Sequence, residues 1–145
     1  MNLSSLTNRG STPALVKTLA FSQAHLKVIA ENVANIQTPG YRAKQLDVRA
    51  FQRALRAALD AKGGDAGKSL VVKSGREVAT DADGFLRVTP SEVPVENILF
   101  HDGTNLSLER QMAKLAETGM THELATTLLA GNFDRIRTAI RGTVA

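Results

Sequence analysis

The sequence predicts a mainly α-helical protein whose long N- and C-terminal helices pair as a coiled-coil-like core. The chain of 145 residues is 43% hydrophobic but only 4% aromatic, with no Trp and one Tyr. Such a composition favours helices over sheets. Near both ends, apolar residues recur at alternating spacings of four and three, as they do in coiled coils. Between the ends we expect a shorter middle helix and a small irregular or β segment.

The first helix is predicted over residues 13–36. Pro13 is tolerated in a first helical turn. The sequence "TPGY" ends the helix, because Pro39 disfavours the helical conformation at Thr38, and Pro39 with Gly40 fits the central positions of a type II turn. The apolar face carries Leu15, Leu19, Leu26, Ile29, Val33 and Ile36.

The middle of the chain predicts one more helix and extended segments. Residues 46–61 form an amphipathic pattern with Asp47 as the candidate N-cap. Residues 62–69, "KGGDAGKS", are expected to be a flexible connection. The β-branched segments 70–75 and 85–90 flank the turn sequence "TDADG". They predict either a small hairpin or irregular extended segments.

The last helix is predicted over residues 106–141. Its 4–3 stripe contains Leu108, Met112, Leu115, Gly119, His122, Thr126, Leu129, Phe133, Ile136 and Ile140. The three non-apolar members mark where the helix is expected to bend or to need support. A helix of about 54 Å is longer than a globule of this size, whose radius of gyration is roughly 15 Å. It must therefore project from the body or pair with the first helix, parallel or antiparallel, with neighbouring subunits completing the packing.

These elements divide the chain into three parts of one structural unit. Residues 1–61 hold the polar, mobile N-terminal stretch, the first helix, the turn and the second helix. Residues 62–105 are the flexible or extended middle, including a loop at 101–105. Residues 106–145 are the C-terminal helix.

No catalytic, cofactor-binding or metal-ligating constellation is predicted, so we expect no enzyme and no cofactor. The chain has no Cys, hence no disulfide or thiolate site. His122-Glu123 lacks the second His of a zinc-protease motif, "DADG" lacks the acidic residue that closes a calcium loop, and "KGGDAGKS" lacks phosphate-loop spacing. We interpret His25 and His122 as packed or interface histidines.

Charge and hydropathy exclude further classes. The net charge is +4 without a run of Lys or Arg. Arg49, Arg53 and Arg56 share one helix face between Asp47 and Asp60, which we interpret as a solvated face rather than a contact with an anionic partner. No apolar run approaches the roughly 20 residues of a membrane span. The N-terminus lacks the pattern of a cleaved signal peptide.

Two stretches resemble the flagellar axial proteins, the family of rod and hook components. In "IAENVANIQTPGYRAKQLDV", residues 29–48, the matching positions are Asn32, Ala34, Asn35, Thr38, Gly40, Tyr41 and Arg42, while Glu31 replaces a usual Asn. Residues 102–142 are similar to the end of the proximal rod members, although the run 119–122 departs from their pattern. The matches there are Asn105, Leu106, Leu108, Glu109, Met112, Ala113, Leu115, Phe133, Ile136, Arg137, Ala139 and Ile140.

The resemblance implies a structural subunit of the proximal rod of the flagellar basal body. Such subunits polymerise through their terminal helices into the drive-shaft tube across the periplasm, and they are exported without a cleaved signal peptide. The implied partners are further copies, other rod proteins, the rod-base adaptor and the export gate, with no nucleic acid and no direct membrane insertion. The residues alone leave open a cytoplasmic helical adaptor or export chaperone, and a small basic nucleic-acid binder.

Two sets of residues are expected to serve assembly. The assembly motif is Asn32, Asn35, Thr38, Pro39, Gly40, Tyr41 and Arg42. In it the two Asn satisfy backbone groups at the helix end, Pro39-Gly40 fixes the exit direction, Tyr41 packs on the core or a neighbour, and Arg42 pairs with an adjacent subunit. The alternative is an ordinary turn. The subunit-packing seam is Leu15, Leu19, Leu26, Ile29, Val33, Ile36, Leu108, Met112, Leu115, Leu129, Phe133, Ile136 and Ile140.

Overall fold

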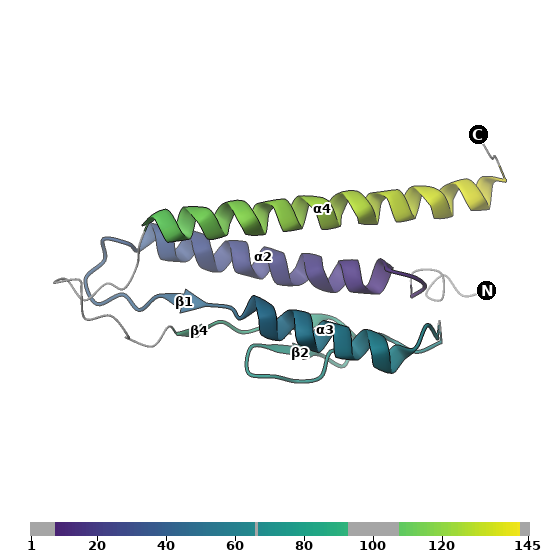
Figure 1. Ribbon diagram of the computed structural model, residues 1–145, viewed down its shortest axis with the longest axis horizontal. Helices are drawn as coiled ribbons and strands as arrows, with labels where there is room; N and C mark the ends of the chain where they lie inside the picture. The colour runs from purple at the N-terminus through teal and green to yellow at the C-terminus, as the bar shows by residue number, and fades with distance from the viewer. Residues whose placement is uncertain (1–7, 66, 93–107, 143–145) are drawn as a thin grey trace.

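The protein is built in three layers with a long helix on each of the first two (Figure 1). The structure, a computed structural model, describes residues 8–65, 67–92 and 108–142. Helix α4 forms one outer layer, α2 lies in the middle, and α3 with the short strands forms the other outer layer. In the described part of the chain, no helix combines the length and the apolar character that crossing a bilayer requires.

Helix α2 spans Thr12–Ala34 and has a Pro in its first turn, as predicted. After the helix, the Tyr41 N–H donates to the Thr38 carbonyl at 3.2 Å. Gly40 has a φ of +74°, which is the conformation that the third residue of a type II turn requires. The turn predicted from "TPGY" is therefore present, and it sends the chain back along α2.

Helix α3 spans Val48–Lys62 and is defined by caps at both ends. The Ala50 N–H donates to the Asp47 carboxylate at 2.9 Å, which confirms the predicted N-cap. Gly63, with a φ of +60°, ends the helix in the left-handed conformation. The helix begins two residues later than the pattern suggested, because Asp47 itself is extended.

Among the described residues, four short strands form two antiparallel pairs. β1 (Lys44–Gln45) pairs with β4 (Ser91–Glu92), and β2 (Val78–Thr80) pairs with β3 (Leu86–Val88). The predicted hairpin exists around "TDADG", but its first arm is β2 rather than residues 70–75. That earlier segment instead lies beside β2, where the Thr80 hydroxyl accepts from the Val72 N–H at 2.9 Å and donates to the Val72 carbonyl at 3.1 Å.

The hydrophobic core lies between α2 and the outer layer of α3 and strands. Phe21 of α2 stacks on Phe51 of α3 with ring centroids 4.1 Å apart. The other buried members are Val28, Leu46, Ala58, Leu70, Val72 and Val78. Three of these come from residues 70–78, so that stretch is part of the core. Full burial of each large side chain contributes about 1.5–3 kcal/mol.

Helix α4 spans Leu108–Arg141 without interruption and runs antiparallel to α2 (Figure 1). It does not break at Gly119, His122 or Thr126. Asn132 pairs with Ser11 and Thr12 at the start of α2. Residues 133–141 then continue past α2 for about 13 Å at 1.5 Å per residue. The projecting end is the geometry expected of a helix too long for its own body.

Several predictions concern residues outside the described ranges. They are the mobility of residues 1–7, the loop at 101–105 with His101, and the start of the C-terminal helix at 106–107.

Candidate functional site

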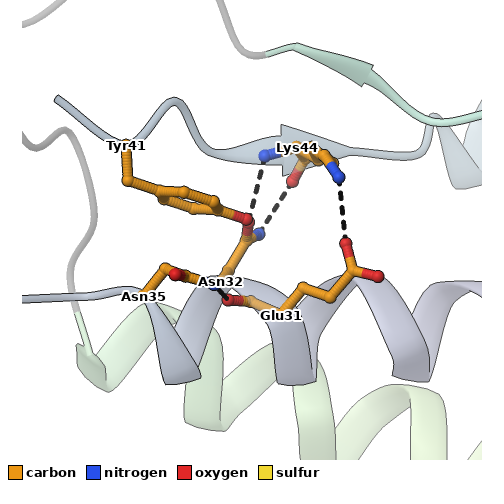
Figure 2. A network of polar contacts seen from close by, with 5 residues as sticks. All are labelled: Glu31, Asn32, Asn35, Tyr41 and Lys44. Carbon is orange, nitrogen blue, oxygen red and sulfur yellow. Dashed lines mark hydrogen bonds and ion pairs between the residues drawn. The ribbon is translucent and has the colours of Figure 1, made fainter. Parts of the chain in front are cut away.

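The amide of Asn32 is the centre of the turn motif (Figure 2). It is buried, and its Nδ2 donates to the Lys44 carbonyl at 2.8 Å while its Oδ1 accepts from the Lys44 N–H at 3.0 Å. The Tyr41 hydroxyl donates to the same Oδ1 at 3.1 Å. One side chain therefore pairs with both backbone groups of a β1 residue, as a neighbouring strand would. It ties the returning chain to α2.

A second group of contacts closes the end of α2 (Figure 2). Asn35 Nδ2 donates to the Glu31 carbonyl at 2.8 Å, one of the terminal acceptors of the helix. The Lys44 ammonium lies 3.1 Å from the Glu31 carboxylate. The hydrogen bond to Glu31 raises the pKa of Lys44. The expectation for Asn35 at the helix end matches this geometry, whereas Asn32 acts on β1 instead.

Arg42 pairs within its own chain. Its guanidinium lies 3.3 Å from the Glu92 carboxylate, and both side chains are mostly exposed. An exposed pair of this kind is worth about 0–1 kcal/mol. The expected contact of Arg42 with an adjacent subunit stays a prediction, and so does the role of Thr38, Pro39 and Gly40 in assembly.

Polar side chains hold α4 to α2. Ser22 Oγ lies 2.9 Å from His122 Nδ1, and Thr118 Oγ1 lies 3.2 Å from His25 Nδ1. Burial lowers the pKa of His25, and the nearby Lys114 lowers it further, while the carboxylates of Glu117 and Glu77 oppose the shift. Both histidines are packed interface residues, as their positions in the sequence suggested.

The face that α4 turns toward α2 is polar or small. Its buried residues are Gln111, Thr118 and Ala125, spaced by seven. The Gln111 Oε1 is buried with no hydrogen-bond partner among the described residues, which weakens this contact. Spacing by seven is also the spacing of the predicted seam, but the buried positions are offset from it. Nothing in the apolar pattern pointed to this offset; the only signal was a second, polar register at the same period.

On α4, the predicted seam lies mostly outside the contact between the two helices. Five of its α4 members are 37–69% exposed: Leu108, Met112, Leu115, Phe133 and Ile140. Leu129 and Ile136 are half-buried, as are Leu15, Leu19, Leu26, Val33 and Ile36 of the N-terminal part, and Ile29 is buried. Packing of the seam against another subunit stays a prediction.

The exposed seam residues of α4 and half-buried seam residues of α2 share one side of the pair. On the other side, Glu117 and Thr121 of α4 join α3 in lining a cavity. At 100° per residue, Met112 and Leu115 lie on the opposite flank of α4. Leu19, Leu26 and Val33 lie on the same flank of α2. We call this apolar flank of the two helices, with Leu108, Phe133 and Ile140, the open flank.

A further apolar strip lies elsewhere on α4. It consists of Met120, Leu124 and Leu128, each at least half exposed. Apolar residues thus surround much of the helix circumference, and a helix of this kind is normally buried in a larger structure. Within the described ranges, no group of three or more His, Asp or Glu side chains is placed to hold a metal ion. The geometry suits assembly by side-chain packing.

Comparison with known proteins points the same way. The family model described as "Flagella basal body rod protein" matches residues 14–42, which cover α2 and the turn motif. The flagellar basal body rod protein FlgB of Borrelia hermsii is 28% identical over 116 residues, 79% of this chain and 83% of the relative. FlgB of Bacillus subtilis (strain 168) is 24% identical over 134 residues, 92% of this chain and 95% of the relative.

The chain is similar to flagellar basal-body rod proteins over most of its length. The matched family segment contains Asn32 and Tyr41, but not their partner Lys44, and it contains the half-buried leucines of α2. The similarity to the two relatives extends over most of the chain, α4 included. The resemblance predicted from the sequence is therefore confirmed at the level of the family.

Proposed function

We propose that this rod protein is a subunit of the proximal rod and polymerises through α2 and α4 into a tubular drive shaft. The single observation that carries the proposal is the open flank. Its large apolar side chains on α4 recur at coiled-coil spacing and are 37–69% exposed, and they continue into half-buried apolar side chains of α2. A contiguous exposed apolar surface of this kind marks an interaction site.

The energetics favour packing against further copies. Burying a half-exposed Leu, Met or Phe contributes about 1 kcal/mol, roughly half of the value for full burial. Five such residues on α4 alone amount to about 5 kcal/mol for each flank that is covered. In the proposed polymer the open flank packs on a different face of the next copy, and such a heterologous contact produces a helical polymer when it does not close.

The partners proposed for this chain follow from the family. They are further copies, other rod proteins, the adaptor at the rod base and the export gate, and the rod would span the periplasm. The projecting end of α4, residues 133–141, supports contacts beyond the subunit itself. No observation in the described ranges favours a cytoplasmic adaptor over this proposal.

An in-frame deletion in the source bacterium tests the proposal. We expect loss of motility, and basal bodies that keep the membrane ring but lack rod and filament in electron micrographs. A plasmid-borne copy of the gene should restore both. Complete, rotating flagella in the deletion strain would overturn the rod function and favour the cytoplasmic adaptor.

A further inference from the structure

We propose that the Phe85 side chain of one copy inserts into the cavity between α2, α3 and α4 of the next copy. This inference rests on the proposed polymer and adds to it a specific contact outside the open flank. Four observations carry it: a rigidly presented aromatic side chain, a cavity of matching size, complementary charges around the two, and their separation within one chain.

The β2–β3 turn presents Phe85 as a fixed knob. The residue is 68% exposed. The Phe85 N–H donates to the Asp81 carboxylate at 2.7 Å, and the Asp81 N–H donates to the Phe85 carbonyl at 2.9 Å. From α2, the Lys17 ammonium donates to the Gly84 carbonyl at 2.5 Å. An aromatic side chain on so constrained a turn loses little conformational entropy when it is buried.

The cavity between the three helices has the size and chemistry for a phenyl ring. Its volume is about 190 Å³, and an apolar protein cavity of about 150 Å³ binds benzene. Phe21 and Phe51, which stack on each other, form part of its wall with Val48 and Leu55. His25 lies at its polar end. An aromatic ring entering here meets aromatic neighbours, and aromatic pairs are favourable beyond the area they bury.

The surroundings of knob and cavity carry opposite charges. Asp81 and Asp83 flank the turn that bears Phe85, although Lys17 lies near Asp81. On α3, Gln52 lines the cavity. The next face of that helix carries exposed Arg49, Arg53 and Arg56, and none of the ion pairs found in the described ranges includes them. Among the described residues that line the cavity, Glu117 of α4 is the one acidic group. The positive charge on the α3 side of the cavity therefore favours binding of the acidic turn that bears Phe85.

Within one chain the knob and the cavity lie apart. Thr18 lines the cavity, whereas Lys17 holds the hairpin tip, and consecutive helical residues point about 100° apart. The hairpin lies on the opposite side of the molecule from α4 (Figure 1). The cavity that includes Glu117 and Thr118 of α4 must therefore receive the knob of another copy, and each copy offers its own knob to the next.

Chemical crosslinking tests the contact, since the chain has no native Cys. The deletion strain is complemented with Ala82→Cys/Gln52→Cys, which places one thiol on the exposed turn and one at the cavity rim. Isolated basal bodies are treated with a short bismaleimide. We expect covalent trimers and longer ladders, because each copy links to the next. Each single-Cys variant should stop at dimers or below.

Further variants test whether crosslinking depends on the Phe85 side chain and on the charged residues, or only on the two thiols lying near each other. Phe85→Ala in the double-Cys background should lower the yield of linked species to about one fifth or less, the effect of losing a hot-spot aromatic. The matched control Val71→Ala, an exposed apolar residue away from the turn tip, should leave the yield unchanged. Asp83→Arg or Arg56→Asp alone should lower it about two- to fivefold, and the combined exchange should restore it.

The outcomes distinguish this contact from the proposed function. Basal bodies that contain the chain but give no ladder, or a ladder unaffected by Phe85→Ala, would overturn the contact and leave the rod function intact. A crosslink between this chain and a different protein would overturn the proposal that a second copy of the chain fills the cavity. Basal bodies that lack the chain would overturn the rod function and this contact together.

Discussion

At the scale of single residues, the Asn32 amide bonds backbone groups in the way that the edge of a neighbouring strand would. Asn32 bonds both backbone groups of Lys44 and also accepts from Tyr41. An apolar side chain of similar size could not replace this buried amide, because it would leave the N–H and carbonyl groups of Lys44 unpaired. The position of the returning chain therefore depends on a few polar atoms at the end of α2.

Gly40 provides the residue-scale prediction. Its φ of +74° is strained for any L side chain, even though a Cβ atom added at this position would meet no other part of the described chain within 4 Å. Gly40→Val should lower the free energy of unfolding by about 1–2 kcal/mol, measured by urea denaturation of the full chain. Gly40→Asn is the control and should lower it less, because Asn tolerates the left-handed region. Equal stability of the Val variant and the parent would contradict a special turn.

At the scale of elements, the α2–α4 contact contains polar pairs, and the buried residues of its α4 side are polar or small. Ser22, His25, Thr118 and His122 supply its hydrogen bonds. Net contributions of such bonds are about 0.5–1.5 kcal/mol each. These bonds are modest in strength, and large apolar side chains of α4 stay exposed.

This contact also predicts a pH dependence of stability. Burial and Lys114 lower the pKa of His25 from its ordinary value of 6.5, so the unfolded chain binds the proton more readily than the folded one. The stabilisation is complete above the unfolded pKa, and it declines as the pH falls below it toward the folded pKa. Between about pH 7 and about pH 5 the free energy of unfolding should fall more steeply for the parent than for His25→Asn. Identical slopes in chemical denaturation would contradict this assignment.

At the scale of the whole molecule, α2 is covered on two sides while α4 is covered on one. The core lies between α2 and the α3 layer, and in the described part of the chain α4 packs mainly on α2 across its polar face. The subunit is therefore stable around α2 and incomplete around α4. Stability of the subunit and capacity for assembly depend on different surfaces.

Charged substitutions on the open flank should separate these two properties. Met112→Glu and Leu115→Glu change exposed side chains, so the free energy of unfolding of the full chain should change by about 0.5 kcal/mol or less. Rod assembly in the complemented deletion strain should nevertheless be lost, as seen in basal-body micrographs and motility. Val71→Glu, the same change at an exposed position outside α4, should assemble normally. Normal assembly of both α4 variants would contradict packing through this flank.

The sequence predicted local features well and the choice of helix face poorly. The Asp47 cap and the turn at Gly40 depend only on residues close in the sequence, so the sequence was enough to predict them. The partner of the seam could not be predicted in this way, because helix contacts within a chain and between chains both produce a period of seven. Leu108 and Met112 matched the stronger apolar register, yet Gln111 and Thr118 face α2. The β1–β4 pair joins residues so far apart in the sequence that no local pattern predicts the pairing.

The separation in sequence between α2 and α4 has a kinetic consequence. Ser22 and His122 are 100 positions apart, whereas Val72 and Thr80 are eight apart. Closing a longer loop has a larger entropic cost, and contacts of high sequence separation form more slowly. The α3 and hairpin layer can therefore organise early, and α4 docks last through a modest polar contact. In the polymer proposed above, an arriving chain would then keep its final helix available when it meets the growing end.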